Sequence, residues 1–328
     1  MRMNKHTFHN GKAVSSVSLG TWQLGAEWGN VSEADAMAVL DTAVASGINF
    51  FDTADVYGDG RSERLIGAFL AANPGLDVMV ATKMGRRVPQ LHENYTLDAF
   101  RGWLDRSRRN LGVDRIDLVQ LHCPPSSIYG DNRVFDALDT LVDEQRIAAY
   151  GVSVEKTSEA MEAIARPGVA SVQIIANAFR LKPFEEVMPA AAERGVSIIA
   201  RVPLASGLLS GRYTADTVFA ENDHRTFNRH GEAFDVGETF AGVDFERGVE
   251  AAREFAALVP EGVTPAQAAI AWLAQQEGVT TVIPGARSPE QVRANAAAGA
   301  LPPLGAAFDA GVRALYDRYF RADVHGRW

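Results

Sequence analysis

Short runs of apolar and β-branched residues recur along the chain, and a stretch with helical periodicity follows each of them. The runs are nearly continuous in apolar character, which is typical of parallel strands covered on both faces. A strand that alternates with a helix implies a parallel crossover, and eight such units favour a closed barrel. We therefore predict an α/β fold, a (β/α)8 TIM barrel with long loops at its C-terminal face. The eight predicted strands are Val14–Gly20, Ile48–Asp55, Val78–Met84, Ile116–Cys123, Ala148–Val154, Val169–Asn177, Val196–Leu204 and Thr280–Ala286.

Helix start signals agree with this alternation. Thr264 is a good N-cap, Pro265 suits the first helical position, and Gln267 is placed to reach back to the cap. Ser32 precedes another amphipathic stretch and is expected to cap its helix in the same way.

One long stretch, Tyr213–Val243, shows neither the helical nor the strand periodicity and contains several glycines. Within a compact domain, a segment of this length is usually a functional loop or a lid, and a disordered insertion is the alternative. No linker of biased composition interrupts the rest of the chain. We therefore expect residues 1–328 to form a single domain.

Composition narrows the class of protein. The 328 residues suit one barrel of about 250 residues with insertions. The net charge of -9 argues against a surface for nucleic acid or anionic membranes, which needs excess Lys and Arg. The single cysteine, Cys123, permits no intrachain disulfide. Residues Met1–Gly11 are polar and lack the apolar run of a secretory signal, and no stretch reaches the length of a membrane span. A cytoplasmic protein is expected.

Four chemically useful side chains follow three consecutive predicted strands: Asp52, Tyr57, Lys83 and His122. Each has an ordinary structural explanation as a turn residue, a packed phenol, a lysine that reaches solvent, or a structural histidine. Together they converge on the carboxyl ends of the strands, where barrel enzymes build their sites. A Lys83 ammonium held by Asp52 would lower the pKa of Tyr57 and make it a general acid. His122 would then orient a carbonyl oxygen beside that phenol.

With these residues in place, the sequence resembles the aldo-keto reductase superfamily through almost its whole length. The resemblance carries the catalytic tetrad of that family onto the same four residues. It implies reduction of aldehydes or ketones to alcohols by NADPH, with hydride from the nicotinamide and the proton from Tyr57. The matching residues are Leu19–Trp22, Gly47–Ala54, Tyr57, Gly58, Glu63, Gly67, Lys83, His122, Gly151–Ser153, Pro203, Leu204, Gly207–Leu209 and Ile283–Gly285.

No glycine-rich dinucleotide fingerprint follows the first predicted strand. The resemblance instead places the nucleotide against the last barrel unit, where a short helix begins near Ser288 and Pro289. The free N–H groups of that helix, together with Arg287, would hold a phosphate, and a solvated loop arginine is the alternative. Gln291 and Asn295 lie four residues apart on one helical face, which suits them to bind adenine. We expect NADPH rather than NADH, because a cation is available for the 2′-phosphate.

The nicotinamide end departs from the family pattern in two places. Ser153 and Gln173 match the carboxamide contacts of the family, but Val154 stands where the family usually has Asn. Arg201 stands where the family usually has an aromatic residue that stacks on the ring, and an arginine plane can stack in the same way. The other cofactor contacts that the resemblance implies are Gly20, Thr21, Pro203, Leu204, Ser206, Gly207 and Gly285.

The substrate site is expected to be largely apolar. Trp22, Tyr57 and His122 are its candidate residues, with Trp28 and the terminal Val324–Trp328 as further candidates. Packing without any contact to substrate is the alternative for each tryptophan.

Neither a thiol nucleophile nor a metal is expected. Cys123 follows His122 directly, and adjacent strand residues point to opposite faces, so the two should not act together. The seven histidines show no metal-type spacing. The expected partner is a small-molecule carbonyl substrate, and the sequence leaves open whether the protein is a monomer or a homo-oligomer. Two further functions stay open with the same residues: NAD(P)-dependent oxidation of a polyol or cyclitol, and a nicotinamide-binding regulatory subunit.

Overall fold

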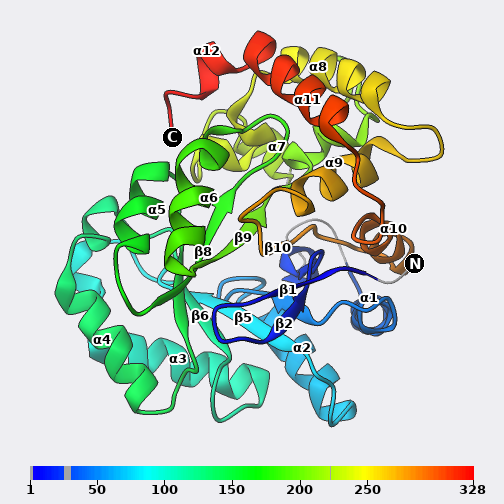
Figure 1. The fold of residues 1–328 in the computed structure, drawn as a ribbon. Helices are drawn as coiled ribbons and strands as arrows, with labels where there is room; N and C mark the ends of the chain where they lie inside the picture. Colours follow the sequence, from blue (N-terminus) through cyan, green and yellow to red (C-terminus); the bar gives the residue numbers. More distant parts are fainter. Residues whose placement is uncertain (1–2, 26–30, 222) are drawn as a thin grey trace.

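The computed structural model describes residues 3–25, 31–221 and 223–328. In these ranges, eight parallel strands pair in their order along the chain, and helices surround them (Figure 1). Parallel bridges from Val17 to Val282 and from Gly20 to Gly285 join the first strand to the last, so the sheet closes on itself. The predicted (β/α)8 barrel is confirmed. Its strands are β3 (Leu19–Gly20), β4 (Phe50–Asp52), β5 (Met79–Met84), β6 (Leu118–His122), β7 (Tyr150–Ser153), β8 (Val169–Ile175), β9 (Ser197–Arg201) and β10 (Thr281–Val282).

The predicted helix starts are confirmed. Ser32 accepts a hydrogen bond from the Asp35 N–H, and Thr264 and Gln267 form the reciprocal capping box. The α-helices are α1 (Glu33–Ala45), α2 (Arg61–Ala72), α3 (Leu97–Leu111), α4 (Asn132–Asp143), α5 (Thr157–Ile164), α6 (Lys182–Arg194), α7 (His224–Phe227), α8 (Phe245–Leu258), α9 (Pro265–Ala274), α10 (Pro289–Ala298), α11 (Ala306–Tyr319) and α12 (Arg321–Val324). The 3-10 helices are η1 (Trp22–Gly25), η2 (His92–Asn94), η3 (Ser126–Ile128), η4 (Ala205–Ser210), η5 (Val236–Glu238) and η6 (Phe240–Gly242).

The first predicted strand is wrong in its first half. Ala13–Ser15 (β2) does not join the barrel but pairs with Lys5–Thr7 (β1) in an antiparallel hairpin, drawn in dark blue in Figure 1. The Ser15 N–H donates to Asn49 Oδ1 at 2.8 Å, and this side-chain bond replaces the ladder bond that a barrel strand would make there. The hairpin packs its apolar residues into the barrel interior, and so closes the N-terminal end of the barrel. The residues in that contact are Phe8, Val14, Phe50, Met79, Ala81, Leu118, Ile199 and Ile283.

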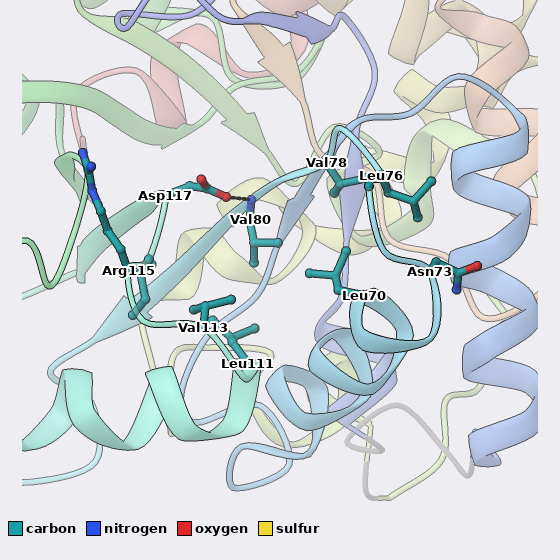
Figure 2. Close-up of a pocket in the computed structure, with 11 residues that line it drawn as sticks. Leu70, Asn73, Leu76, Val78, Val80, Leu111, Val113, Arg115 and Asp117 are labelled. Carbon is teal, nitrogen blue, oxygen red and sulfur yellow. Dashed lines mark hydrogen bonds between the residues drawn. The ribbon is translucent and has the colours of Figure 1, made fainter.

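A cavity of about 240 Å³ also lies at this N-terminal end, between α2 and the starts of β5 and β6 (Figure 2). Its walls are mostly apolar, and the Asp117 carboxylate beside it accepts the Val80 N–H at 2.9 Å. In barrels of this type the strand N-termini serve stability, whereas the opposite face carries the chemistry. The cavity is therefore separate from the predicted site. It is lined by Leu70, Asn73, Gly75, Leu76, Val78, Val80, Leu111, Val113, Arg115, Ile116 and Asp117.

The segment Tyr213–Val243, apart from residue 222, contains α7, η5 and η6 and packs on the barrel mouth. Ser206 joins it to the loop after β9, since its hydroxyl donates to Glu238 O at 3.1 Å and accepts the Phe240 N–H at 2.9 Å. Trp28, a predicted substrate residue, lies outside the described residues. No helix in the described part of the chain has both the length and the apolar character that a membrane crossing needs.

Candidate active site

The four predicted catalytic residues meet at the C-terminal mouth of the barrel. Asp52 ends β4, Lys83 lies near the end of β5, His122 ends β6, and Tyr57 lies in the turn before α2. Lys83 Nζ forms an ion pair with the Asp52 carboxylate and lies 3.4 Å from the Tyr57 hydroxyl. The imidazole of His122 meets the Tyr57 ring edge-on, with 6.0 Å between ring centroids. A phenol, an ammonium and an imidazole therefore face one point.

Two buried glutamines hold the carboxylate end of this group. Asp52 Oδ2 accepts hydrogen bonds from Gln173 Nε2 at 2.7 Å and from Gln120 Nε2 at 3.2 Å. The sequence assigned Gln173 to the nicotinamide carboxamide, whereas in the structure its amide nitrogen binds Asp52. Gln120 was missed, although its place two residues before His122 puts both side chains on the same face of β6.

The protonation states follow from burial and from the neighbouring charges. Burial raises the pKa of Tyr57 above its ordinary value, and the Lys83 ammonium offsets only part of that rise. The prediction that Lys83 lowers the pKa of Tyr57 overall is wrong, because the cost of burying a phenolate outweighs the attraction. Burial also acts to lower the pKa of Lys83, but Asp52 and Tyr57 raise it above its ordinary value. At neutral pH the site therefore holds a neutral phenol beside a charged ammonium.

The imidazole of His122 is also neutral at neutral pH. Burial, with the nearby cations Arg86 and Lys83, lowers its pKa well below the ordinary value. Its Nδ1 is buried and has no hydrogen-bond partner among the described residues. A neutral imidazole carries one N–H, which can be donated to a carbonyl oxygen.

An aromatic wall lies against the Tyr57 phenol. The Trp22 ring stacks on Tyr57 with 6.0 Å between centroids and an interplanar angle of 21°. His224 and Phe234 of the long segment pack on Trp22, with centroids at 5.5 Å and 6.3 Å. The structure thus brings the predicted substrate residues Trp22, Tyr57 and His122 together and adds two that the sequence missed.

The terminal tryptophan has a different environment. Trp328 packs its ring over the Arg180 guanidinium at 4.1 Å and donates from Nε1 to Asp235 at 3.2 Å. These two contacts are with the loop after β8 and with the long segment rather than with Tyr57 or His122. It supports the segment that covers the mouth.

Across the mouth, two arginines and two glutamates form a closed cycle of ion pairs that we call the ionic ring. Arg201, at the end of β9, lies 2.8 Å from Glu238 of η5 and 3.2 Å from Glu155, which follows β7. Arg86, which follows β5, lies 3.3 Å from Glu155 and 4.0 Å from Glu238. The four formal charges cancel. Arg201, which the sequence assigned to ring stacking, is therefore held by carboxylates from two separate segments.

The members of the ionic ring differ in how strongly their charged forms are favoured. Burial acts to raise the pKa of Glu238, but Arg201 and Arg86 bring it below its ordinary value. Burial likewise acts to lower the pKa of Arg201, and the two glutamates raise it well above its ordinary value. Burial raises the pKa of Glu155 despite Arg201. Glu238 and Arg201 are therefore the firmly charged members.

Cys123, Glu155 and Glu238 place possible metal-ligand atoms within 4.8 Å of one another. The Arg201 guanidinium already binds both carboxylates and lies 3.7 Å from the sulfur. Burial raises the pKa of the Cys123 thiol to about 12, so the thiol is protonated at neutral pH. We assign no metal to this group.

The predicted nucleotide residues surround one loop after β10. Ser288 caps α10 by accepting the Gln291 N–H. Gln291 Oε1 accepts the Arg287 N–H at 2.8 Å, and Asn295 Nδ2 donates to Gly285 O at 3.2 Å. A guanidinium, a hydroxyl and two amides thus gather at a helix N-terminus, and this donor set fits a phosphorylated adenosine.

The remaining predicted cofactor residues lie at neighbouring strand ends. The loop after β9 is strained: φ is 55° at Val202, 53° at Ser206 and 98° at Gly207, and Pro203 and Leu204 lie between them. A positive φ at a β-branched residue is rare, and such strain is concentrated at functional loops.

The carboxyl ends of β3 and β7 carry the remaining predicted cofactor residues. The Thr21 hydroxyl donates to Asp52 O at 2.8 Å, and Gly20 pairs with Gly285. Ser153 ends β7, and its hydroxyl lies 3.4 Å from Cys123 Sγ. These groups therefore border the same mouth as the catalytic residues.

Comparison with known proteins places this arrangement in a family. The model of the Aldo/keto reductase family matches residues 16–316. An uncharacterized oxidoreductase of Mycobacterium tuberculosis is 33% identical over 294 residues, which cover 87% of this chain and 84% of the relative. A Schizosaccharomyces pombe protein named aldo-keto reductase yakc [NADP(+)] is 28% identical, covering 86% of this chain and 83% of its own. The solved glycerol dehydrogenase of Gluconobacter oxydans superposes with a TM-score of 0.77 at 27% identity, over 97% of this chain and 95% of the other.

Proposed function

Because this chain belongs to the aldo/keto reductase family, we propose that it reduces an aldehyde or ketone to an alcohol with NADPH. Hydride passes to the carbonyl carbon, and Tyr57 gives a proton to the carbonyl oxygen. The observation that carries the proposal is the Tyr57 hydroxyl placed 3.4 Å from the buried Lys83 ammonium and edge-on to a neutral imidazole. A neutral acid beside a fixed cation is what a developing alkoxide requires.

Each residue of the group has one task. His122 donates its N–H to the substrate oxygen and so fixes the carbonyl against Tyr57. Tyr57 keeps its proton until transfer, since burial raises its pKa, and Lys83 then stabilises the phenolate that remains. Asp52, with Gln120 and Gln173, keeps Lys83 charged and immobile. The nicotinamide supplies the hydride when it is bound.

The cofactor residues are proposed from the donor sets described above. Arg287 and Ser288 would hold the 2′-phosphate, and Gln291 and Asn295 the adenine. The S. pombe relative is named as an NADP(+) enzyme, which agrees with a cation at this position. Ser153 and the other residues at the ends of β3, β7 and β9 would hold the nicotinamide half.

Oxidation of a polyol is the second candidate, favoured by the fold similarity to glycerol dehydrogenase. It uses the same residues in reverse, but Tyr57 must then act as a phenolate base. The raised pKa of Tyr57 disfavours that form at neutral pH, so reduction is the direction that the site supports better. A purely regulatory role would not need the buried Lys83–Tyr57 contact. The cytoplasm is the compartment that we propose, since the composition and the single cysteine suit it.

The experiment is to follow NADPH oxidation with a panel of aldehydes and ketones for the wild type and Tyr57→Phe. Loss of a general acid should lower kcat by about 100-fold or more, while NADPH affinity stays within a few fold. Wild-type turnover by Tyr57→Phe would refute the role of this phenol.

A further inference from the structure

The ionic ring borders the groups that would carry out the reduction. Arg86 Nε donates to His122 O at 3.2 Å. The field of the ring reaches the reacting positions, because Arg86 and Arg201 help to lower the pKa of His122 and Glu238 helps to raise that of Tyr57. A charge that develops near Tyr57 and His122 therefore interacts electrostatically with the charges of the ionic ring.

The ring is neutral as a whole and poorly solvated. Its arginine side chains are 22% and 9% exposed, and its glutamate side chains 14% and 10%. The catalytic pair of Asp52 and Lys83 beside it also sums to zero. Charge interactions in such a site are screened much less than at the surface, so a single unpaired charge would have a large effect.

A hydride donor changes its charge during this reaction. In the proposed reduction, a neutral dihydronicotinamide would supply the hydride and become cationic. The Tyr57 proton would go to the carbonyl oxygen, which leaves an alcohol and a Tyr57 phenolate beside Lys83. A site with net positive charge would hold the reduced cofactor and repel the oxidised one. A neutral site holds both.

We propose that the ionic ring sets the balance between the oxidised and the reduced cofactor, with Glu238 supplying the negative charge that makes the cationic nicotinamide tolerable beside Arg201 and Arg86. This inference rests on the proposed function. It assigns a role to the long segment, because Glu238 belongs to η5 and enters the mouth only when that segment is packed on the barrel. It also gives a reason for an arginine at the end of β9 that pairs with two carboxylates.

The test is an equilibrium titration of the purified protein with NADP+ and, separately, NADPH, followed by tryptophan fluorescence at fixed salt. Glu238→Gln leaves the ring with a net positive charge, so the ratio of Kd for NADP+ to Kd for NADPH should rise about tenfold. Arg201→Gln leaves it with a net negative charge, so the ratio should fall by a similar factor. For the bound two-electron couple, a tenfold change is about 30 mV, positive for the first variant and negative for the second.

Two controls match these variants. Glu238→Asp keeps the charge and should keep the ratio near that of the wild type. Glu193→Gln removes an exposed glutamate from α6 and should change neither Kd. If Glu238→Gln proves unstable, Glu155→Gln removes the other carboxylate of the ring and should shift the ratio in the same direction.

The outcomes separate this inference from the function on which it rests. If the wild type binds both nucleotides but Glu238→Gln and Arg201→Gln weaken them equally, or shift the ratio in the same direction, the ring has only a structural role and the inference is overturned. If the wild type binds neither nucleotide, the proposed function itself is overturned, and the inference with it. Opposite shifts in the two variants support the ring as the source of the balance.

Discussion

Two buried ionic groups lie at the same barrel mouth, and they are built in opposite ways. The Asp52–Lys83 pair joins neighbouring strands, and the other polar contacts of Lys83 are neutral oxygens. The ionic ring joins the ends of three strands to the long segment, and each arginine lies within 4.0 Å of both glutamates. If one member of the Asp52–Lys83 pair is removed, the other loses its counter-charge. In the ionic ring, each charged group keeps a second oppositely charged neighbour. The pair fixes the group that we propose to be catalytic, and the ring holds the long segment on the barrel.

This difference predicts unequal losses of stability. Asp52→Asn leaves the Lys83 ammonium buried without a counter-charge and should cost about 3 kcal/mol of unfolding free energy. Glu238→Gln leaves Arg201 paired with Glu155 and should cost only about 1 kcal/mol. Urea denaturation of both variants measures the two values. Equal losses would show that the ring is no more redundant than the pair.

The pair should dominate turnover. In Lys83→Met, Tyr57 loses the cation that partly lowers its pKa, so the phenol becomes a poorer acid and kcat should fall about 100-fold at neutral pH. Asp52→Asn should lower kcat less, because the lysine remains. Steady-state kinetics at saturating NADPH gives both numbers, and an unchanged kcat in Lys83→Met would leave that lysine without a catalytic role.

A third arrangement, a buried acid without a partner, sharpens the comparison. Both side-chain oxygens of Asp55 are buried and lack hydrogen-bond partners among the described residues. Burial, with repulsion from Glu63, raises its pKa to about 7. The folded protein therefore keeps a proton that the unfolded chain loses near pH 4, so Asp55 lowers stability progressively as the pH rises from about 4 to about 7.

Asp55→Asn removes this penalty. The variant should gain stability over the wild type, and the gain should be about 2 kcal/mol larger at pH 8 than at pH 5. Chemical denaturation at the two pH values measures it. A gain that does not depend on pH would mean that Asp55 is already paired and charged.

The last prediction concerns an exposed cation outside both groups. Arg287→Ala should weaken NADPH by about 1.5 kcal/mol and barely change NADH, since only NADPH carries the 2′-phosphate. The loss should shrink at high salt, because an exposed charge is screened. Fluorescence titration of both cofactors checks it, and equal losses for the two would assign Arg287 to a group that both share.

The two ionic groups also show what a sequence can predict. Asp52, Lys83 and His122 lie at the carboxyl ends of consecutive strands. The parallel order of a barrel brings such ends together, so their meeting followed from the eight-strand pattern. The helix starts after Ser32 and Thr264 followed from local capping chemistry in the same way.

The ion-pair partners of Arg201 could not be predicted from the sequence. Glu238 lies in a segment without periodicity, and only the packed structure shows where that segment lies. The pKa of Tyr57 was misjudged for a related reason: the attraction of Lys83 can be foreseen from the motif, but the extent of burial cannot. The N-terminal hairpin is tied to Asn49 by side-chain hydrogen bonds that no pattern indicated: Asn49 Oδ1 accepts the Ser15 N–H, and Asn49 Nδ2 donates to Ala13 O.

The central claim is hydride transfer to a carbonyl carbon with Tyr57 as the acid. Its most direct measurement is turnover of an aldehyde by NADPH labelled with deuterium at both C4 positions, with mass spectrometry of the alcohol product. The account predicts one deuterium on the former carbonyl carbon for the wild type, and about 100-fold slower formation of the same labelled alcohol by Tyr57→Phe. Product without deuterium, or no product from any carbonyl compound, would contradict it.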